Sequence, residues 1–426
     1  MKKITPSQLF TWLVYGSLFL LPWQTRYIYG QSTIAGTPFD FGVMSIYAVQ
    51  IIIAIAFFVG QRMNIRKDHQ LSVRAIGVVL LATAASIPLS HDVNLSLSAW
   101  SMLLFSGLLF ACLLDQRVQT WTAMRCFVAG LIIPSVLGLV QFFSGSSPAS
   151  KWLGLAVHHA SDLGAAVIAE NGERLLRAYG TFPHPNIFGG YLAIGLLCAF
   201  MLAMRAKKQT EQILSRVVLV LFSFALVSTF SRSAWLALAG AGIAALFLLV
   251  LKRREAIKRG LPTVGLVFLS LFIAAAAFVA PLESRFNLSL PLELQSVDQR
   301  VNQYQAFPRV LNGSMMTGVG IGAYTVALAD VMPGESVFAY QPIHNTPLLV
   351  FAETGILGVI AVFLWAASVD RVNYVAIARK SIPAIGGIAL GTVPLVVIFF
   401  DHYIWSSWAG LALLAFLMAM TLRLSE

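Results

Sequence analysis

The residues best suited to chemistry stand where long apolar runs begin. His344-Asn345-Thr346-Pro347 opens one such run. Pro347 suits the first helical position, and Asn345 or Thr346 suits the helix cap. The imidazole of His344 is therefore expected beside a helix N-terminus, where free N–H groups favour anions. A neutral imidazole there can accept a proton from a hydroxyl nucleophile. The alternative is a histidine that only binds a loop carbonyl.

Arg232 and its flanking serines interrupt an otherwise apolar stretch, 217–251. Arg216 and Lys252 bracket the stretch, so the chain must turn back near Arg232. Each half has roughly 15–18 residues, or ~22–27 Å of helix, which is short of a ~30 Å hydrocarbon core. We therefore expect the turn to lie slightly below the membrane surface, where an arginine indicates a functional site with a partner. The alternative is an arginine that snorkels to the headgroups.

A helical stretch is predicted over residues 295–307. Its apolar residues recur on one face, which is expected to lie on the membrane or to cap the bundle; they are Val297, Val301 and Tyr304. Arg300 borders this face and is a candidate to reach a lipid phosphate. Arg309 follows Pro308, which should interrupt the helix, so Arg309 is the weaker candidate. The alternative for Arg300 is a plain interfacial anchor.

The segment from Arg177 to Asn186, with the sequence Arg-Ala-Tyr-Gly-Thr-Phe-Pro-His-Pro-Asn, leads into another apolar run. Two prolines fix the entry, and Asn186 suits a helix cap. His184 is expected to contact either a substrate or only its own loop. We therefore count Arg177, His184 and Asn186 as a second set of candidate binding residues.

Glu353 lies inside the run that follows His344, where a buried carboxylate needs a cation or hydrogen bonds. We expect it to pair with an arginine such as Arg232, in a structural rather than a catalytic role. Asp401-His402 ends a later apolar run, with the same alternatives of function and structure. The cysteines, Cys112, Cys126 and Cys198, have no metal-ligand spacing, and no metal site, nucleotide P-loop or cofactor is expected.

The elements that position these residues are membrane helices. The chain of 426 residues is 58% hydrophobic and only 11% charged, whereas soluble domains carry ~25% charged residues. Runs long enough to span a bilayer recur throughout, which predicts an all-α integral membrane protein of about twelve spans. The expected spans are 8–23, 39–60, 71–90, 95–114, 122–143, 187–204, 217–231, 234–251, 262–281, 346–369, 383–403 and 405–422.

The distribution of positive charge predicts the orientation. Of the 29 lysines and arginines, 21 fall in one set of alternating loops and 8 in the other. The rich side is expected to be cytoplasmic, together with both termini. Two long segments, about 144–186 and 282–343, then face outward, and the chain forms a single membrane domain, 1–426. Because the charges are scattered over short loops, nucleic acid is not an expected partner.

Taken together, these residues resemble the superfamily of O-antigen ligases and O-antigen polymerases, which are membrane glycosyltransferases. The resemblance is strongest from about Arg177 onward. The pieces that carry it are the Tyr179–Asn186 segment, Thr229–Ser233, Arg300, Gly318-Val-Gly-Ile-Gly322, His344-Asn345 and Glu353–Gly358. The glycine motif lacks a βαβ context, so we read it as tight turns and not as a dinucleotide site.

The resemblance implies a reaction at the outer face of the inner membrane. A glycan would move from a polyprenyl diphosphate carrier to an acceptor hydroxyl, with inversion and without metal. Arg232 and Arg300 would bind the diphosphate, and His344 would activate the acceptor hydroxyl or orient it. As a base, His344 should make activity fall as the pH drops through the histidine range, ~6.5 if its pKa is unperturbed. In ligases the acceptor is lipid A–core, in polymerases a lipid-linked repeat unit, and in a related branch a protein hydroxyl. Chain size and the long loop before His344 favour a ligase.

A transporter or flippase for a lipid-linked glycan is the alternative of another class. Such proteins place charges at the membrane midplane and have internal repeats. Here the polar residues gather toward one face and no repeat is evident, which favours the transferase.

Overall fold

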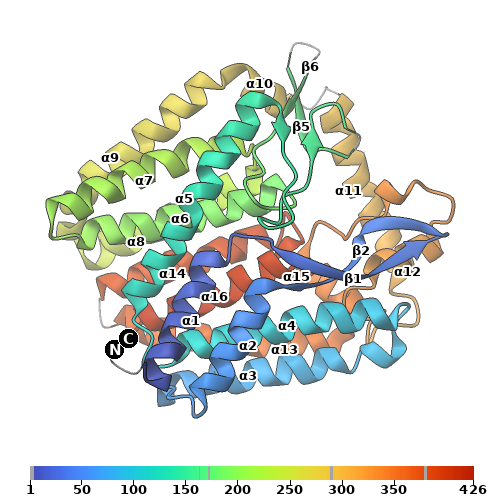
Figure 1. Cartoon of the computed structure of the whole chain (residues 1–426), viewed down its shortest axis with the longest axis horizontal. Coiled ribbons are helices and arrows are strands. Elements are labelled where there is room, and N and C mark those ends of the chain that lie inside the picture. Colours follow the sequence, from blue (N-terminus) through green and yellow to red (C-terminus); the bar gives the residue numbers. More distant parts are fainter. Residues whose placement is uncertain (1–3, 163, 171–172, 288–290, 379–380) are drawn as a thin grey trace.

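The computed structural model describes residues 4–162, 164–170, 173–287, 291–378 and 381–426. Most of these residues are helical (Figure 1). The helices are α1 (Pro6–Leu20), α2 (Ala48–Gly60), α3 (Lys67–Ala84), α4 (Val93–Leu114), α5 (Thr120–Ser144), α6 (Pro185–Arg205), α7 (Gln209–Ser228), α8 (Arg232–Lys252), α9 (Arg254–Ala277), α10 (Val279–Phe286), α11 (Pro291–Val310), α12 (Tyr324–Val331), α13 (Thr346–Ala378), α14 (Ile382–Val397), α15 (Tyr403–Ser406) and α16 (Trp408–Leu424), with 3-10 turns η1 (Ile87–Leu89) and η2 (Val337–Ala339).

The protein is an integral membrane protein. Within the described residues, eight helical segments are long and apolar enough to cross a bilayer, namely α3 with η1, α4, α5, α6, α7, α8, α9 and α13. Three shorter apolar helices, α2, α14 and α16, accompany them. The predicted spans overlap these helices and α1, so the expectation of about twelve full-length spans is confirmed only in part.

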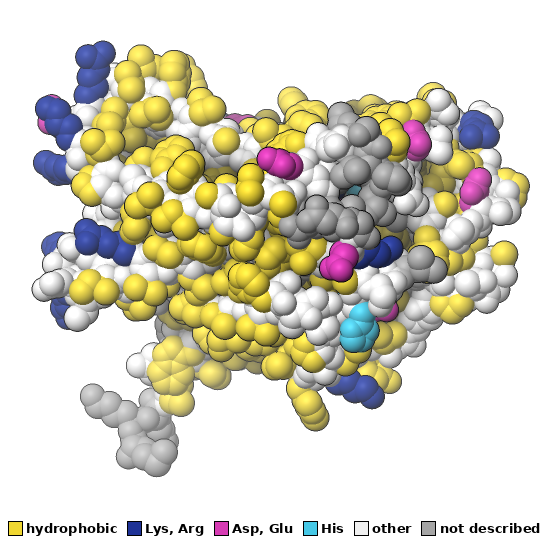
Figure 2. All heavy atoms as spheres, turned by 90° about the horizontal axis from the view of Figure 1, so that it is seen from above, with side chains coloured by type: hydrophobic (Ala, Val, Ile, Leu, Met, Phe, Trp, Pro, Cys, Tyr) yellow, Lys and Arg dark blue, Asp and Glu magenta, His cyan; other side chains and the backbone are white. Residues whose placement is uncertain are grey.

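Both termini lie at one end of the helix bundle, here named the terminal end (Figure 1). The strands and α11 lie toward the opposite end, here named the loop end. Lysine and arginine side chains gather at the terminal end (Figure 2). This arrangement agrees with the charge split along the sequence and with a cytoplasmic terminal end. The orientation itself stays a prediction.

A β-hairpin replaces the first part of the span predicted over 39–60. Strands β1 (Arg26–Ile34) and β2 (Thr37–Tyr47) pair antiparallel, and α2 begins only at Ala48. In β2, Phe39, Gly42, Ser45 and Tyr47 are buried. Burial alternates as in a strand from Ser45 to Tyr47, and the alternation is broken at Gly42, where the pairing with β1 shifts register between Val43 and Pro38. The hairpin is thus a third feature of the loop end, where the sequence predicted only a short connection.

The two long segments are folded at the loop end. The first contains the paired strands β3 (Ser146–Ser147) and β4 (His158–His159), then β5 (Val167–Glu170) and β6 (Glu173–Leu176). The second contains α10, α11 and α12. The helix predicted over 295–307 is α11. Its face of Val297, Val301 and Tyr304 is exposed, which agrees with a face on the membrane rather than one packed as a cap on the bundle. Pro308 does not end α11, because helical bonding resumes beyond it, with Leu311 N donating to Phe307 O.

The hairpin of α7 and α8 is longer than the apolar pattern suggested. The two helices have 20 and 21 residues, or ~30 Å each, because α7 starts at Gln209, before the apolar run. We expected both helices to be too short to cross the hydrocarbon core, which would place the turn at Arg232 below the membrane surface. The predicted helix lengths are therefore wrong. Arg232 is the first residue of α8, and the Ser231 hydroxyl caps this helix by accepting from Ala234 N at 3.4 Å.

α13 is broken at Gly355, whose backbone has φ 62° and ψ −167°. The break leaves carbonyl groups free for a loop that contains Gly318, Gly320 and Gly322, which adopt positive φ as the predicted tight turns require. Val319 N donates to Ala352 O at 2.8 Å and Gly320 N to Glu353 O at 3.0 Å. The first part of α13 therefore forms a separate half-helix whose N-terminus follows His344.

Candidate functional site

His344 is held by α11 at the loop end. Its backbone N–H donates to Gln303 Oε1 at 3.2 Å, and its ring Nδ1 lies 3.0 Å from the same oxygen. Because this oxygen can only accept, Nδ1 carries the ring proton and Nε2 retains its lone pair in the neutral ring. A histidine of this tautomer can accept a proton at Nε2. The alternative expected from the sequence, a bond to a loop carbonyl, is replaced by a side-chain amide.

A second histidine lies against the first. The rings of His344 and His402 meet edge to face with centroids 5.0 Å apart. His402 Nδ1 lies 2.7 Å from Ser406 Oγ in α15, and its ring contacts Phe41 of β2 at 5.5 Å. The hairpin therefore forms one wall of the histidine pair.

A chain of polar side chains runs from Asp401 to Arg177. Asn186 Nδ2 donates to Asp401 Oδ2 at 2.7 Å, and Arg177 donates to Asn186 Oδ1 at 2.6 Å. Arg177 Nε also donates to the carbonyl of Thr229 at 2.7 Å. Asp401 and Arg177 are buried, so each charge depends on this chain. The chain joins the start of α6, the end of α7 and the turn after α14.

His344, His402, Asp401, Asn186 and Arg177 are here named the cluster. Their surroundings set the charge states of its titratable groups. Burial, with the neighbouring His402 and Arg300, holds the pKa of His344 below its ordinary value, so its imidazole is neutral near pH 7. Burial alone would raise the pKa of Asp401, but the adjacent histidines and the His402 N–H lower it, so the carboxylate is ionised. An ionised carboxylate beside the pair favours a histidine that becomes charged during a reaction.

The other three candidate arginines occupy different places. Arg300 lies on α11 close enough to influence the charge of both His344 and His402. Arg232 donates to the backbone carbonyl of Arg285 at 3.5 Å. Arg309 donates to Val331 O at 3.4 Å, and among the described residues no hydrogen bond joins it to the histidines.

The helix caps beside the cluster differ partly from the prediction. His184, not Asn186, caps α6, with its Nδ1 accepting from Asn186 N at 3.1 Å. The expectation that Asn186 caps this helix is therefore wrong, because its amide is used between Arg177 and Asp401. Asn345 caps α13 as predicted, accepting from Leu348 N at 3.1 Å. Its amide also lies 3.4 Å from the Tyr304 hydroxyl.

Glu353 is buried and pairs with neutral donors. Trp405 Nε1 donates to Glu353 Oε2 at 2.7 Å, and the backbone N–H groups of Gly322 and Tyr324 also donate to this carboxyl group. The expected pairing with Arg232 is wrong, since the glycine turns and α15 supply the hydrogen bonds. Glu353 thus ties the half-helix of α13 to the element that follows His402.

Sequence reasoning missed two contributors to this cluster. Gln303 lies three residues after Arg300 on α11, at helical spacing, and that spacing was the available signal. Phe41 was predicted to lie in a membrane span. The alternation of apolar and other residues around it was the only signal that could have predicted a strand instead. Asp401-His402 was noticed, but nothing local in the sequence indicates that it meets His344.

Residues 217–363 match the family model described as O-antigen ligase. The predicted resemblance is confirmed over this stretch, which covers roughly a third of the chain. The stretch holds Arg232, Arg300, Arg309, His344, Asn345 and Glu353. The segment from Arg177 to Asn186 lies outside it, as do Asp401 and His402. Among curated proteins, none matches the chain.

Proposed function

We propose that the protein is an O-antigen ligase-type glycosyltransferase. It moves a glycan from a polyprenyl diphosphate to an acceptor hydroxyl at the outer face of the inner membrane. The observation that carries the proposal is the contact of His344 Nδ1 with Gln303 Oε1 at 3.0 Å, from which it follows that Nε2 keeps its lone pair. The match of residues 217–363 to the O-antigen ligase family supports it.

The proposed reaction is a direct displacement. His344 Nε2 takes the proton of the acceptor hydroxyl while the hydroxyl oxygen forms a bond to the anomeric carbon. The bond from that carbon to the diphosphate oxygen breaks with inversion, and the diphosphate leaves with the electron pair. Arg232 and Arg300 bind the growing negative charge, which guanidinium groups do bidentately. Asp401 stabilises the charged histidine cluster that results.

The test is a transfer assay with purified protein in lipid vesicles. Polyprenyl-diphosphate glycan is supplied with one acceptor at a time: lipid A–core, a second lipid-linked glycan, or a peptide with hydroxyl side chains. Mass analysis should find the glycan on lipid A–core. Transfer to the second lipid-linked glycan would identify a polymerase, and transfer to the peptide a protein glycosyltransferase. Movement of the donor between leaflets without a new glycosidic bond would identify a flippase and overturn the proposal.

A further inference from the structure

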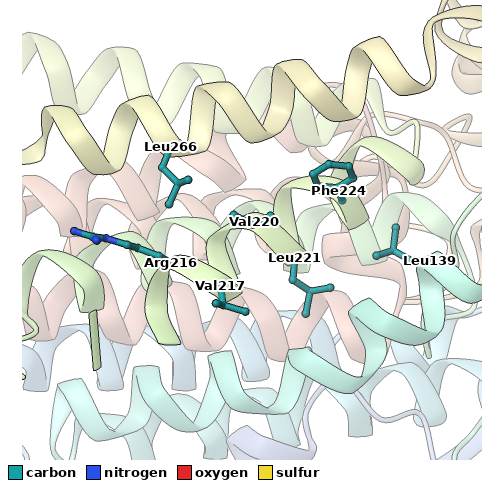
Figure 3. A pocket seen from close by; sticks show the side chains of 7 residues that line it. All are labelled: Leu139, Arg216, Val217, Val220, Leu221, Phe224 and Leu266. Atoms are coloured by element: carbon teal, nitrogen blue, oxygen red, sulfur yellow. The ribbon is translucent and has the colours of Figure 1, made fainter. Parts of the chain in front are cut away.

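A groove runs along the membrane-facing surface of α5, α7 and α9. Two depressions share Leu139 and Leu221 and are therefore continuous. The first lies between α5 and α9 over α7, as Figure 3 shows. The second follows α5 to its end. The groove is lined by Val136, Leu139, Val140, Phe143, Ser144, Arg216, Val217, Val220, Leu221, Phe224 and Leu266.

The chemistry of the lining fits a hydrocarbon chain. Polar groups occur only near its two ends, at Arg216 and Ser144. The guanidinium of Arg216 points away from Leu221 and Phe224, so its stem is the part that faces the groove (Figure 3). All three helices are candidate membrane spans. A groove of this kind faces lipid chains and gives an anionic headgroup no partner along its length.

The loop end of the groove lies beside the turn that carries Arg232. Phe224 lies one helical turn before the end of α7 at Ser228, and Arg232 opens α8. Buried rings of Phe142, Phe230 and Phe278 pack here, with centroids 4.8 Å apart for Phe142 and Phe278 and 5.8 Å apart for Phe142 and Phe230.

Two arginines, Arg232 and Arg285, lie next to this aromatic cluster. Arg285 Nε lies 3.4 Å from the carbonyl of Phe230, and Arg232 donates to the carbonyl of Arg285 at 3.5 Å. Phe143 lines the groove and its ring centroid lies 6.0 Å from that of Phe278, so the loop end of the groove and the two arginines adjoin the same aromatic cluster. The occupant that this arrangement fits has a long apolar chain and an anionic head that can bind two arginines.

We propose that the groove binds the isoprenoid chain of a polyprenyl diphosphate, and that Arg285 joins Arg232 at its diphosphate. The proposal rests on the proposed function and names where its donor lies. A membrane phospholipid is the competing occupant, with its phosphate at Arg216 and its chains running toward Leu221. The two guanidinium groups at the loop end favour the diphosphate, because a phospholipid held at Arg216 would leave that end of the groove without a charged head.

The first experiment narrows the groove. Leu221→Trp and Leu139→Trp add bulk at the two shared positions, and Ile243→Trp on the exposed surface of α8 is the matched control. Two donors carry the same glycan diphosphate, one on a full-length polyprenyl chain and one on a chain of two isoprene units. The groove variants should raise KM for the long donor about tenfold, equivalent to ~1.4 kcal/mol. KM for the short donor, and both values for the control, should stay unchanged.

The second experiment uses the unmodified protein, so its result does not depend on whether a groove variant folds. A polyprenyl diphosphate with a photoreactive group on its isoprenoid chain is crosslinked to the unmodified protein, and the labelled peptides are sequenced. Labels should fall on α5 and α7 and be displaced by unlabelled polyprenyl diphosphate. Arg285→Gln should weaken this displacement, whereas Arg216→Gln should not.

Several results would overturn the proposal. They are labels on other helices, an unchanged KM of the long donor in both groove variants, and an equal loss with long and short donors. Release of a copurifying phospholipid by Arg216→Gln, together with a loss of crosslinking in that variant and none in Arg285→Gln, would identify a phospholipid as the occupant. If the protein labels as expected yet transfers neither donor, the groove assignment stands and the proposed transferase activity fails.

Discussion

His344 differs from an ordinary surface histidine because one oxygen receives both its backbone N–H and its ring Nδ1–H. Gln303 therefore fixes the orientation of the ring as well as its tautomer. The neighbouring His402 ring, whose centroid lies 5.0 Å away, also limits rotation of the His344 ring. A general base must hold its lone pair toward the proton it takes, and this arrangement supplies that condition before any substrate binds.

His344→Ala should reduce turnover by ~10²–10⁴, the usual contribution of a general base. Donor binding should persist, because the arginines bind the diphosphate. His344→Gln can accept the bond from an acceptor hydroxyl but cannot take its proton, so it should be as slow as alanine. Turnover of both variants at saturating donor is the measurement. Wild-type turnover in the glutamine variant would mean that His344 orients the acceptor and is not a base.

The pH profile should be flat through the ordinary histidine range. Because the pKa of His344 is lowered, the neutral base is lost only below the lowered value and not near ~6.5. The lowered pKa thus moves the expected fall in activity below the pH of ~6.5 that an unperturbed histidine would give. Turnover at saturating donor should change little from about pH 8 to about pH 5.5. A midpoint near ~6.5 would show that the imidazole titrates as it does in water.

Arg232→Ala should abolish transfer while the protein still accumulates in the membrane. Arg232→Lys should restore little, since lysine lacks the planar fork that binds two phosphate oxygens. Arg174→Ala is a suitable control, because Arg174 lies in the same end of the molecule and donates to the carbonyls of Ala160 and Asp162. Near-normal transfer by the lysine variant would indicate that a point charge suffices.

At the scale of elements, the break in α13 positions the start of this helix. A Cβ at Gly355 would overlap the backbone of Met316, so the loop from α11 can approach only a glycine. Ile356 N donates to Met315 O at 3.0 Å across this contact. The half-helix is thereby pinned between the glycine turns and α15.

Gly355→Ala should destabilise the protein by at least ~1–3 kcal/mol, because its backbone region is essentially restricted to glycine. The melting temperature in detergent should fall, and transfer should fall with it. Gly265→Ala is the matched control, since no atom lies within 4 Å of a Cβ added there in α9. An unchanged melting temperature for Gly355→Ala would show that α13 straightens without cost.

Local patterns predicted the elements well and their meeting points poorly. The helix over 295–307, the cap at Asn345 and the glycine turns follow from spacing that a short window reveals. The hairpin of β1 and β2 was missed because an apolar run hides the alternation over 39–47. The chain from Arg177 to Asp401 joins segments far apart in sequence, and only the packing of α6 against α14 and α15 brings them together.

At the scale of the whole molecule, the cluster lies at the end opposite the termini. Single cysteines in a variant lacking Cys112, Cys126 and Cys198 test its orientation. Trp152→Cys and Tyr27→Cys replace exposed side chains at the loop end, and Lys258→Cys replaces one at the terminal end. An impermeant thiol reagent should label the first two in intact spheroplasts and the third only after lysis. The reverse pattern would place the candidate site in the cytoplasm.

The polar chain from Arg177 through Asn186 to Asp401 also determines whether the family-matching stretch can work as an independent unit. The stretch that matches the ligase family contains His344 but neither the start of α6 nor the turn after α14. A fragment cut at the boundaries of that match would contain the imidazole of His344 but not the carboxylate of Asp401. Grafting the fragment onto another helical scaffold should therefore transfer no activity. Two coexpressed fragments divided in the loop between α8 and α9 should instead reassemble, because each would bring one side of the site.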